Sequence, residues 1–84
     1  MLSYLIHRTE KLKEVDLKQS FFIAKELSII EINLLWYPEK LDDHTARMRS
    51  LSQHVLITFP NNDDAKVLAV LLKQKALLLE TKIE

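Results

Sequence analysis

The apolar positions of the chain follow helical periodicity, and two prolines divide the pattern into three segments. Pro38 and Pro60 cannot lie inside a helix without loss of a hydrogen bond and a clash with the preceding turn. The clearest pattern follows the second proline, with apolar residues three and four apart at Ala65, Leu68, Leu72, Ala76, Leu79 and Ile83. This spacing predicts a long final helix. Asn61 or Asn62 can supply its left-handed turn and N-cap.

The first segment, residues 1–37, is compatible with one continuous helix or with two. Asp16 followed by Gln19 matches a capping box, which favours a short helix over about residues 2–14 and a second over 17–37. One face of the second helix has ordinary core spacing: Leu17, Phe21, Ala24, Leu27, Ile30 or Glu31, and Leu34. A second row of Phe22, Ile29 and Trp36 repeats every seven residues. A single bundle seam does not need both rows.

The middle segment begins at Pro38, a natural first helical position, with Glu39 placed to complement the helix dipole. One narrow apolar face follows: Leu41, Met48, Leu51, Val55 and Phe59. The stretch HVLITF, residues 54–59, is rich in β-branched side chains and could form a short strand, but no second strand is available to pair with it. We predict an all-α fold in which residues 1–84 form a single domain, a small up-and-down bundle or helical hairpin of three to four antiparallel helices.

The composition supports long helices joined by few turns. Gly is absent, and it is the usual residue where a turn requires positive φ, so β-rich folds and phosphate-binding glycine loops are disfavoured. Cys is also absent, which excludes disulfides and fits a reducing compartment. The N-terminal residues lack the charge order of a signal peptide. The longest apolar run, residues 67–72, is far shorter than the roughly 20 residues that span a bilayer. We therefore expect a cytoplasmic protein.

The charges argue against non-specific nucleic-acid binding. The 12 basic and 12 acidic residues balance, whereas such binding depends on clustered Lys and Arg. Arg47 and Arg49, with Gln53 nearby, are the best candidates for phosphate contacts from a helix. A small helical DNA-binding transcriptional regulator is therefore the alternative function.

No catalytic, cofactor-binding or metal-ligating residue is predicted. The stretch DDHTAR places Asp43 beside His44, but adjacent helical residues point about 100° apart, so His44 is expected to be solvated in the first turn of its helix. His44 and His54 are too far out of phase to share a metal, and no HExxH or EF-hand spacing occurs. Ser50 and Ser52 are expected to face solvent. We expect a protein that is not an enzyme.

Surplus apolar surface is the strongest functional signal. Hydrophobic residues make up 48% of the chain, a share typical of larger domains, which bury more of their surface. The excess lies in two rows, one of Phe22, Ile29 and Trp36 and the other of Leu71 and Leu78, and in the aromatic pair before Pro38. We therefore predict the partner-binding residues to be Phe22, Ile29, Trp36, Tyr37, Leu71 and Leu78. The predicted function is a small interaction module, such as an adaptor, regulator or chaperone-like subunit. It would bind a helical partner or form a homodimer; burial of both rows within one chain is the alternative.

Overall fold

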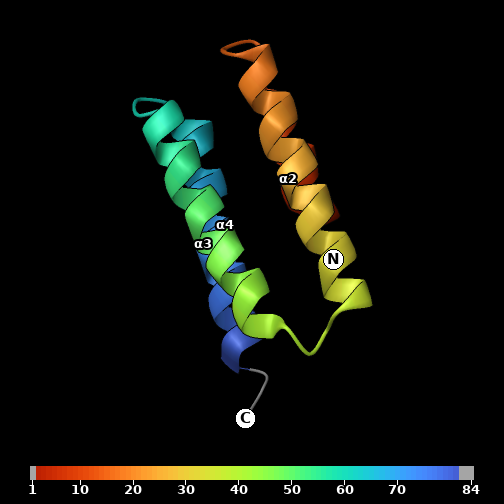
Figure 1. Cartoon of the computed structure of the whole chain (residues 1–84). Helices are drawn as coiled ribbons and strands as arrows, with labels where there is room; N and C mark the ends of the chain where they lie inside the picture. The colour runs from red at the N-terminus through yellow and green to blue at the C-terminus, as the bar shows by residue number, and fades with distance from the viewer. Residues whose placement is uncertain (1, 82–84) are drawn as a thin grey trace.

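Residues 2–81, which the computed structural model describes, form an up-and-down bundle of four helices (Figure 1). The first helix is short and consists of α1 (Ser3–Arg8) followed by the 3₁₀ helix η1 (Thr9–Leu12). The three longer helices are α2 (Leu17–Trp36), α3 (Leu41–Thr58) and α4 (Asp63–Thr81). The predicted all-α bundle is confirmed, and the HVLITF stretch continues α3 as a helix up to Thr58.

The helices occupy the four corners of an elongated bundle of 39 × 20 × 18 Å. α1 and η1 pack against α2 and α4, and α3 also packs against both of these helices. In Figure 1, α4 lies behind α3, and the red N-terminal helix lies behind α2. No contact joins α2 to α4 within residues 2–81, so these two helices lie at opposite corners. Each of them therefore has an outer side that no other helix covers.

Each helix contributes one apolar stripe to the core. The stripes consist of Leu2, Leu5 and Leu12; Ile23, Leu27, Ile30 and Leu34; Met48, Leu51, Val55 and Phe59; and Ala65, Leu68, Ala69, Leu72 and Ala76. The stripes of α3 and α4 follow the predicted spacing, and Ile83 lies outside the described residues. The alanines of α4 allow α3 to approach closely, because a methyl group occupies little space between two backbones.

Ser52 lies at this close approach of α3 and α4. Its hydroxyl donates a hydrogen bond of 2.9 Å to the carbonyl of Ala69, and the residue is fully buried. The expectation that Ser52 faces solvent is therefore wrong, whereas Ser50 is exposed as expected. A small polar side chain can enter the interface because the backbone of the neighbouring helix supplies an acceptor.

The predicted break between the first two helices is confirmed at Asp16. This residue is extended (φ −154°, ψ 100°), and its Oδ1 accepts a hydrogen bond of 3.1 Å from the amide of Gln19. The side chain of Gln19 does not complete the capping box. Its Oε1 instead lies 3.0 Å from Nε2 of His54 on α3. Asp16 thus begins α2, and Gln19 links α2 to α3.

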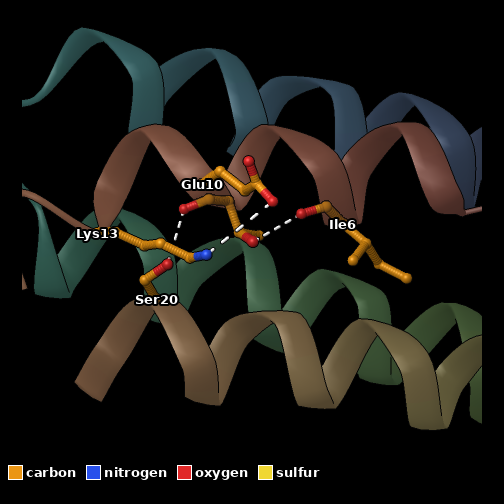
Figure 2. A network of polar contacts seen from close by, with 5 residues as sticks. Ile6, Glu10, Lys13 and Ser20 are labelled. Carbon is orange, nitrogen blue, oxygen red and sulfur yellow. Dashed lines mark hydrogen bonds and ion pairs between the residues drawn. The ribbon is translucent and has the colours of Figure 1, made fainter. Parts of the chain in front are cut away.

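Polar contacts of the first helix set which side of α2 faces inward (Figure 2). The Ser20 hydroxyl donates a hydrogen bond of 2.7 Å to the Thr9 carbonyl, and the Thr9 hydroxyl donates one of 2.7 Å to the Ile6 carbonyl. The buried stripe of α2 therefore begins with Ser20 and Ile23. Leu17 and Phe21, which the sequence placed in the core, are 52% and 54% exposed. That part of the prediction is wrong because a short polar side chain suits the close approach of η1 better than a large apolar one.

The two remaining connections are the turns before α3 and before α4. No residue in the range 2–81 has a positive φ, so neither turn uses a left-handed residue. α3 begins at Leu41 rather than at Pro38, because Pro38 and Glu39 lie in a turn closed by the Lys40 amide and the Tyr37 carbonyl at 3.0 Å. Before α4, Oδ1 of Asn62 accepts a hydrogen bond of 3.0 Å from the Ala65 amide. The predicted Asn cap is therefore confirmed, and the predicted left-handed turn is wrong.

Candidate protein-interaction surface

The outer side of α2 carries an extended apolar surface. Eight side chains of α2 are exposed, of which six are large and apolar and two are lysines: Leu17, Phe21, Phe22, Ile32, Leu35 and Trp36, with Lys18 and Lys25. These eight residues, together with the exposed Tyr37 at the C-terminal end of the helix, are named the α2 face below. Trp36 is 72% exposed and Leu35 is 64% exposed. The exposed apolar side chains lie in the first two and the last two turns of the helix, and Lys25 is the only exposed residue between Phe22 and Ile32.

The outer side of α3 shows what a solvated helix of this bundle looks like. α3 also exposes eight side chains, but only Ile57 among them is large and apolar. The others are charged, polar or small: Asp42, Asp43, Ala46, Arg47, Arg49, Ser50 and Gln53. The two helices are of nearly equal length, so the apolar outer side of α2 is not shared by α3. α4 is intermediate, because it exposes four large apolar side chains: Val67, Val70, Leu77 and Leu78.

The α2 face is large enough to form a stable interface. Its seven apolar side chains together expose on the order of 700 Å², given their exposed fractions and aromatic areas of about 150–250 Å². The largest apolar patch of a typical monomer covers about 300–600 Å². A standard protein interface buries about 800 Å² on each partner. Summed over both ends of the helix, the exposed apolar area therefore approaches that of one side of a standard interface.

Both carboxylates of α2 lie at the edges of the face and are engaged with neighbouring helices. Oε1 of Glu26 lies 3.6 Å from Nη2 of Arg47. Oε2 of Glu31 accepts a hydrogen bond of 2.6 Å from the Leu2 amide. This hydrogen bond lowers the pKa of the Glu31 carboxyl, while burial acts in the opposite direction. The two lysines are therefore the charged residues of α2 that are mostly open to solvent, whereas Glu26 and Glu31 are half-buried and engaged.

Several rings of the α2 face have neighbours that hold them in place. The ammonium group of Lys13 lies 5.4 Å from the centre of the Phe21 ring, and that of Lys40 lies 5.7 Å from the centre of the Tyr37 ring. The Phe22 ring lies 5.2 Å from the imidazole of His54, tilted by 57°. These contacts favour defined ring positions at both ends of the face.

The corner between α2 and α3 is built around His44, which was expected to be solvated. That expectation is wrong, because His44 is only 6% exposed and its Nε2 lies 2.7 Å from the carbonyl oxygen of Tyr37. A carbonyl only accepts hydrogen bonds, so Nε2 carries a proton and donates it. His44 faces inward because it lies four, seven and eleven residues before Met48, Leu51 and Val55, on the buried side of α3. The imidazole therefore fixes the end of α2, next to Trp36, and does not face solvent.

The six residues predicted to bind a partner fall into two separate regions. Phe22, Trp36 and Tyr37 belong to the α2 face, and Ile29 is half-buried beside it. Leu71 and Leu78 instead line a groove of about 250 Å³ between α1 and α4, together with Tyr4, Leu5, Gln74 and Lys75. Because α2 and α4 lie at opposite corners, the structure does not bring the two predicted rows together.

Four apolar members of the α2 face were not among the predicted partner-binding residues: Leu17, Phe21, Ile32 and Leu35. The same holds for its two lysines, Lys18 and Lys25. Leu17 and Phe21 had been assigned to the core, and Ile32 and Leu35 to neither row. The detectable signal was Ser20, since a serine in phase with Ile23, Leu27 and Leu34 marks a possible close helix contact. The stripe that includes Ser20 lies on a different side of the helix from Leu17, so Leu17 faces outward when this stripe is buried.

Arg47 and Arg49, the candidates for phosphate contacts, are both paired with carboxylates. Arg47 contacts Glu26, as described above, and Arg49 forms an ion pair with Glu80 of α4. These pairs hold α3 to its two neighbours and compete with phosphate for the guanidinium groups, which weakens the support for DNA binding.

Two further results concern other kinds of site. Within residues 2–81, no group of three or more His, Cys, Asp and Glu side chains is arranged to hold a metal ion. The described helices include none that is long and apolar enough to cross a membrane.

Comparisons of the chain with known protein families, with curated proteins and with solved structures found no match. The class of the protein is therefore defined by its fold, a small all-α bundle.

Proposed function

We propose that this four-helix protein is a non-enzymatic interaction module whose α2 face binds another polypeptide. The observation that carries the proposal is the composition of the exposed side of α2, with six large apolar side chains and two lysines. An exposed apolar patch of this size is costly in water and is typical of a binding surface. An adaptor, regulator or chaperone-like subunit would use such a surface.

The residue types and their placement support this proposal. Trp and Tyr are enriched among the residues that dominate binding energies, and Trp36 and Tyr37 adjoin at the end of the face. Their backbone is held by the hydrogen bond from His44 to the Tyr37 carbonyl. A fixed backbone lowers the entropy that is lost when these rings dock against a partner. The same hydrogen bond gives His44 a structural role, which supports binding rather than catalysis.

A site-specific photo-crosslink tests the proposal. A photoreactive amino acid placed at Leu35 lies in the α2 face, and the same amino acid at Ile57 provides the matched control. Both positions are exposed and apolar, at 64% and 77%, but Ile57 has no large apolar exposed neighbour on its helix. Each variant is expressed in the cells that make the protein, irradiated, and examined by electrophoresis and mass spectrometry.

The expected result is a discrete adduct with a protein from Leu35 and none from Ile57. Substitution of Trp36 by Ser should reduce that adduct while the melting temperature stays unchanged, because Trp36 is mostly exposed and exposed positions contribute little to folding stability. The proposal fails if Leu35 gives no adduct, or if both positions give the same pattern of adducts.

A further inference from the structure

We infer that the α2 face binds an amphipathic helix of a different protein, which carries two carboxylates seven residues apart opposite Lys18 and Lys25. This inference rests on the proposed function and specifies the partner. Lys18 and Lys25 are the only charged side chains among the exposed residues of α2. No ion pair involves either of them within residues 2–81. A partner that covers the apolar part of the face must also accommodate these two cations.

The spacing of the lysines matches the repeat of a helix. They are seven residues apart, which is about two turns or roughly 10 Å along the axis, so they lie on one side of α2. Two carboxylates seven residues apart on a second helix have the same separation. A helix that packs along α2 can therefore place one carboxylate near each lysine while its apolar stripe covers the surface between them.

A helix fits this surface better than an extended strand does. The backbone groups of α2 are used within the helix, so they offer no edge for strand addition, whereas an apolar helix side is a common site for helix docking. A groove of about 180 Å³ also lies between α2 and α3; it is lined by Phe22, Leu51 and His54 and by the polar side chains of Glu26, Arg47 and Ser50. One apolar side chain of the docked helix can enter this groove.

A second copy of this chain is a poorer match in charge. If two α2 faces paired, each lysine would meet a surface that exposes lysines and no carboxylate of α2. The outer side of α4 exposes Lys66 and Lys73, and its only exposed acid is Asp63 in the first turn. Neither helix offers two exposed carboxylates at the required spacing. Like charges placed together disfavour a partner, so the charge pattern favours a different, acidic protein.

Two synthetic peptides test this inference against the intact chain. Both are amphipathic helices of about 20 residues with a leucine stripe and no Trp; one carries two Glu seven residues apart beside the stripe, and the other carries two Lys at the same positions. Trp36, the only Trp of the chain, reports binding through its fluorescence. The protein variants are the double substitution Lys18→Glu with Lys25→Glu, and Lys73→Glu on α4 as the control.

The Glu peptide should bind the unaltered protein about tenfold more tightly than the Lys peptide, because two ion pairs with Lys18 and Lys25 replace two repulsions. The Lys18→Glu, Lys25→Glu variant should reverse this preference. The Lys73→Glu variant should retain it, since Lys73 lies on α4 and α2 makes no contact with that helix. Circular dichroism confirms that each variant is folded.

Three outcomes would overturn the inference. One is equal affinity for both peptides, and another is binding of neither peptide. The third is concentration-dependent dimerisation in light scattering that Leu35→Glu abolishes, which would identify a second copy as the occupant. In each case the Leu35 crosslink decides separately whether the α2 face binds protein, so failure of the charge inference and failure of the proposed function give different results.

Discussion

Replacement of His44 tests how the corner between α2 and α3 is held. In the structure its Nε2 donates a hydrogen bond of 2.7 Å to the Tyr37 carbonyl, and His44 is only 6% exposed. Two substitutions separate the contributions: His44→Phe keeps a ring of similar size without the donor, and His44→Ala removes both the donor and most of the packing. His7→Ala is the control, because His7 is exposed.

The magnitude follows from the two contacts that are lost. The hydrogen bond contributes about 1 kcal/mol. The Tyr37 carbonyl keeps its bond from the Lys40 amide, so the substitution leaves no unsatisfied acceptor. The buried ring contributes roughly 1 kcal/mol more through its apolar atoms. We therefore expect losses in the free energy of unfolding of about 1 kcal/mol for His44→Phe and about 2 kcal/mol for His44→Ala.

Thermal and urea denaturation followed by circular dichroism measure these losses. In a domain of this size, 1 kcal/mol lowers the melting temperature by about 4–8 °C, so His44→Ala should melt about 8–16 °C below the unaltered protein. His7→Ala should differ by less than about 0.5 kcal/mol. If His44→Ala were as stable as His7→Ala, the buried hydrogen-bonded placement of His44 would be refuted.

Three further predictions concern the remaining buried or capping polar groups. Ser52→Ala should lower the free energy of unfolding by about 1 kcal/mol, because it removes the hydrogen bond to Ala69. Ser52→Leu should lower it by about 1–3 kcal/mol or more through overpacking. If urea denaturation gives the opposite order, the close contact of α3 and α4 at Ser52 is contradicted. The pKa of Glu31 is lower in the folded state, so its carboxylate adds stability that is present above about pH 4.3 and lost as the pH falls through the folded pKa. Glu31→Gln should therefore be less stable at pH 7 and lose less stability on acidification; an unchanged acid profile argues against the bond to Leu2. Asp16→Ala should cost about 1 kcal/mol through loss of the α2 cap, whereas Asp16→Asn should be nearly neutral; equal melting temperatures for the two variants would contradict this.

The sequence by itself determined the helices and most of their ends. The three-and-four spacing of Leu68, Leu72 and Ala76 produces a core stripe wherever it forms a helix, and a proline ends a helix because it lacks an amide proton. Asp16 begins α2 through a hydrogen bond to an amide three residues away. These effects are local, since each depends on neighbours along one chain segment.

Only the tertiary structure decided which side of α2 faces outward. Apolar residues surround most of that helix, so two different stripes satisfy the helical repeat, and periodicity cannot choose between them. The choice depends on the contact of Ser20 with the Thr9 carbonyl, which brings η1 close to α2 and leaves Leu17 and Phe21 exposed. His44 and Ser52 are likewise buried against backbone carbonyls that other segments supply. Every residue carries a backbone carbonyl, so the sequence does not show which carbonyl will accept a hydrogen bond. Only the folded arrangement brings one of them opposite a particular side chain.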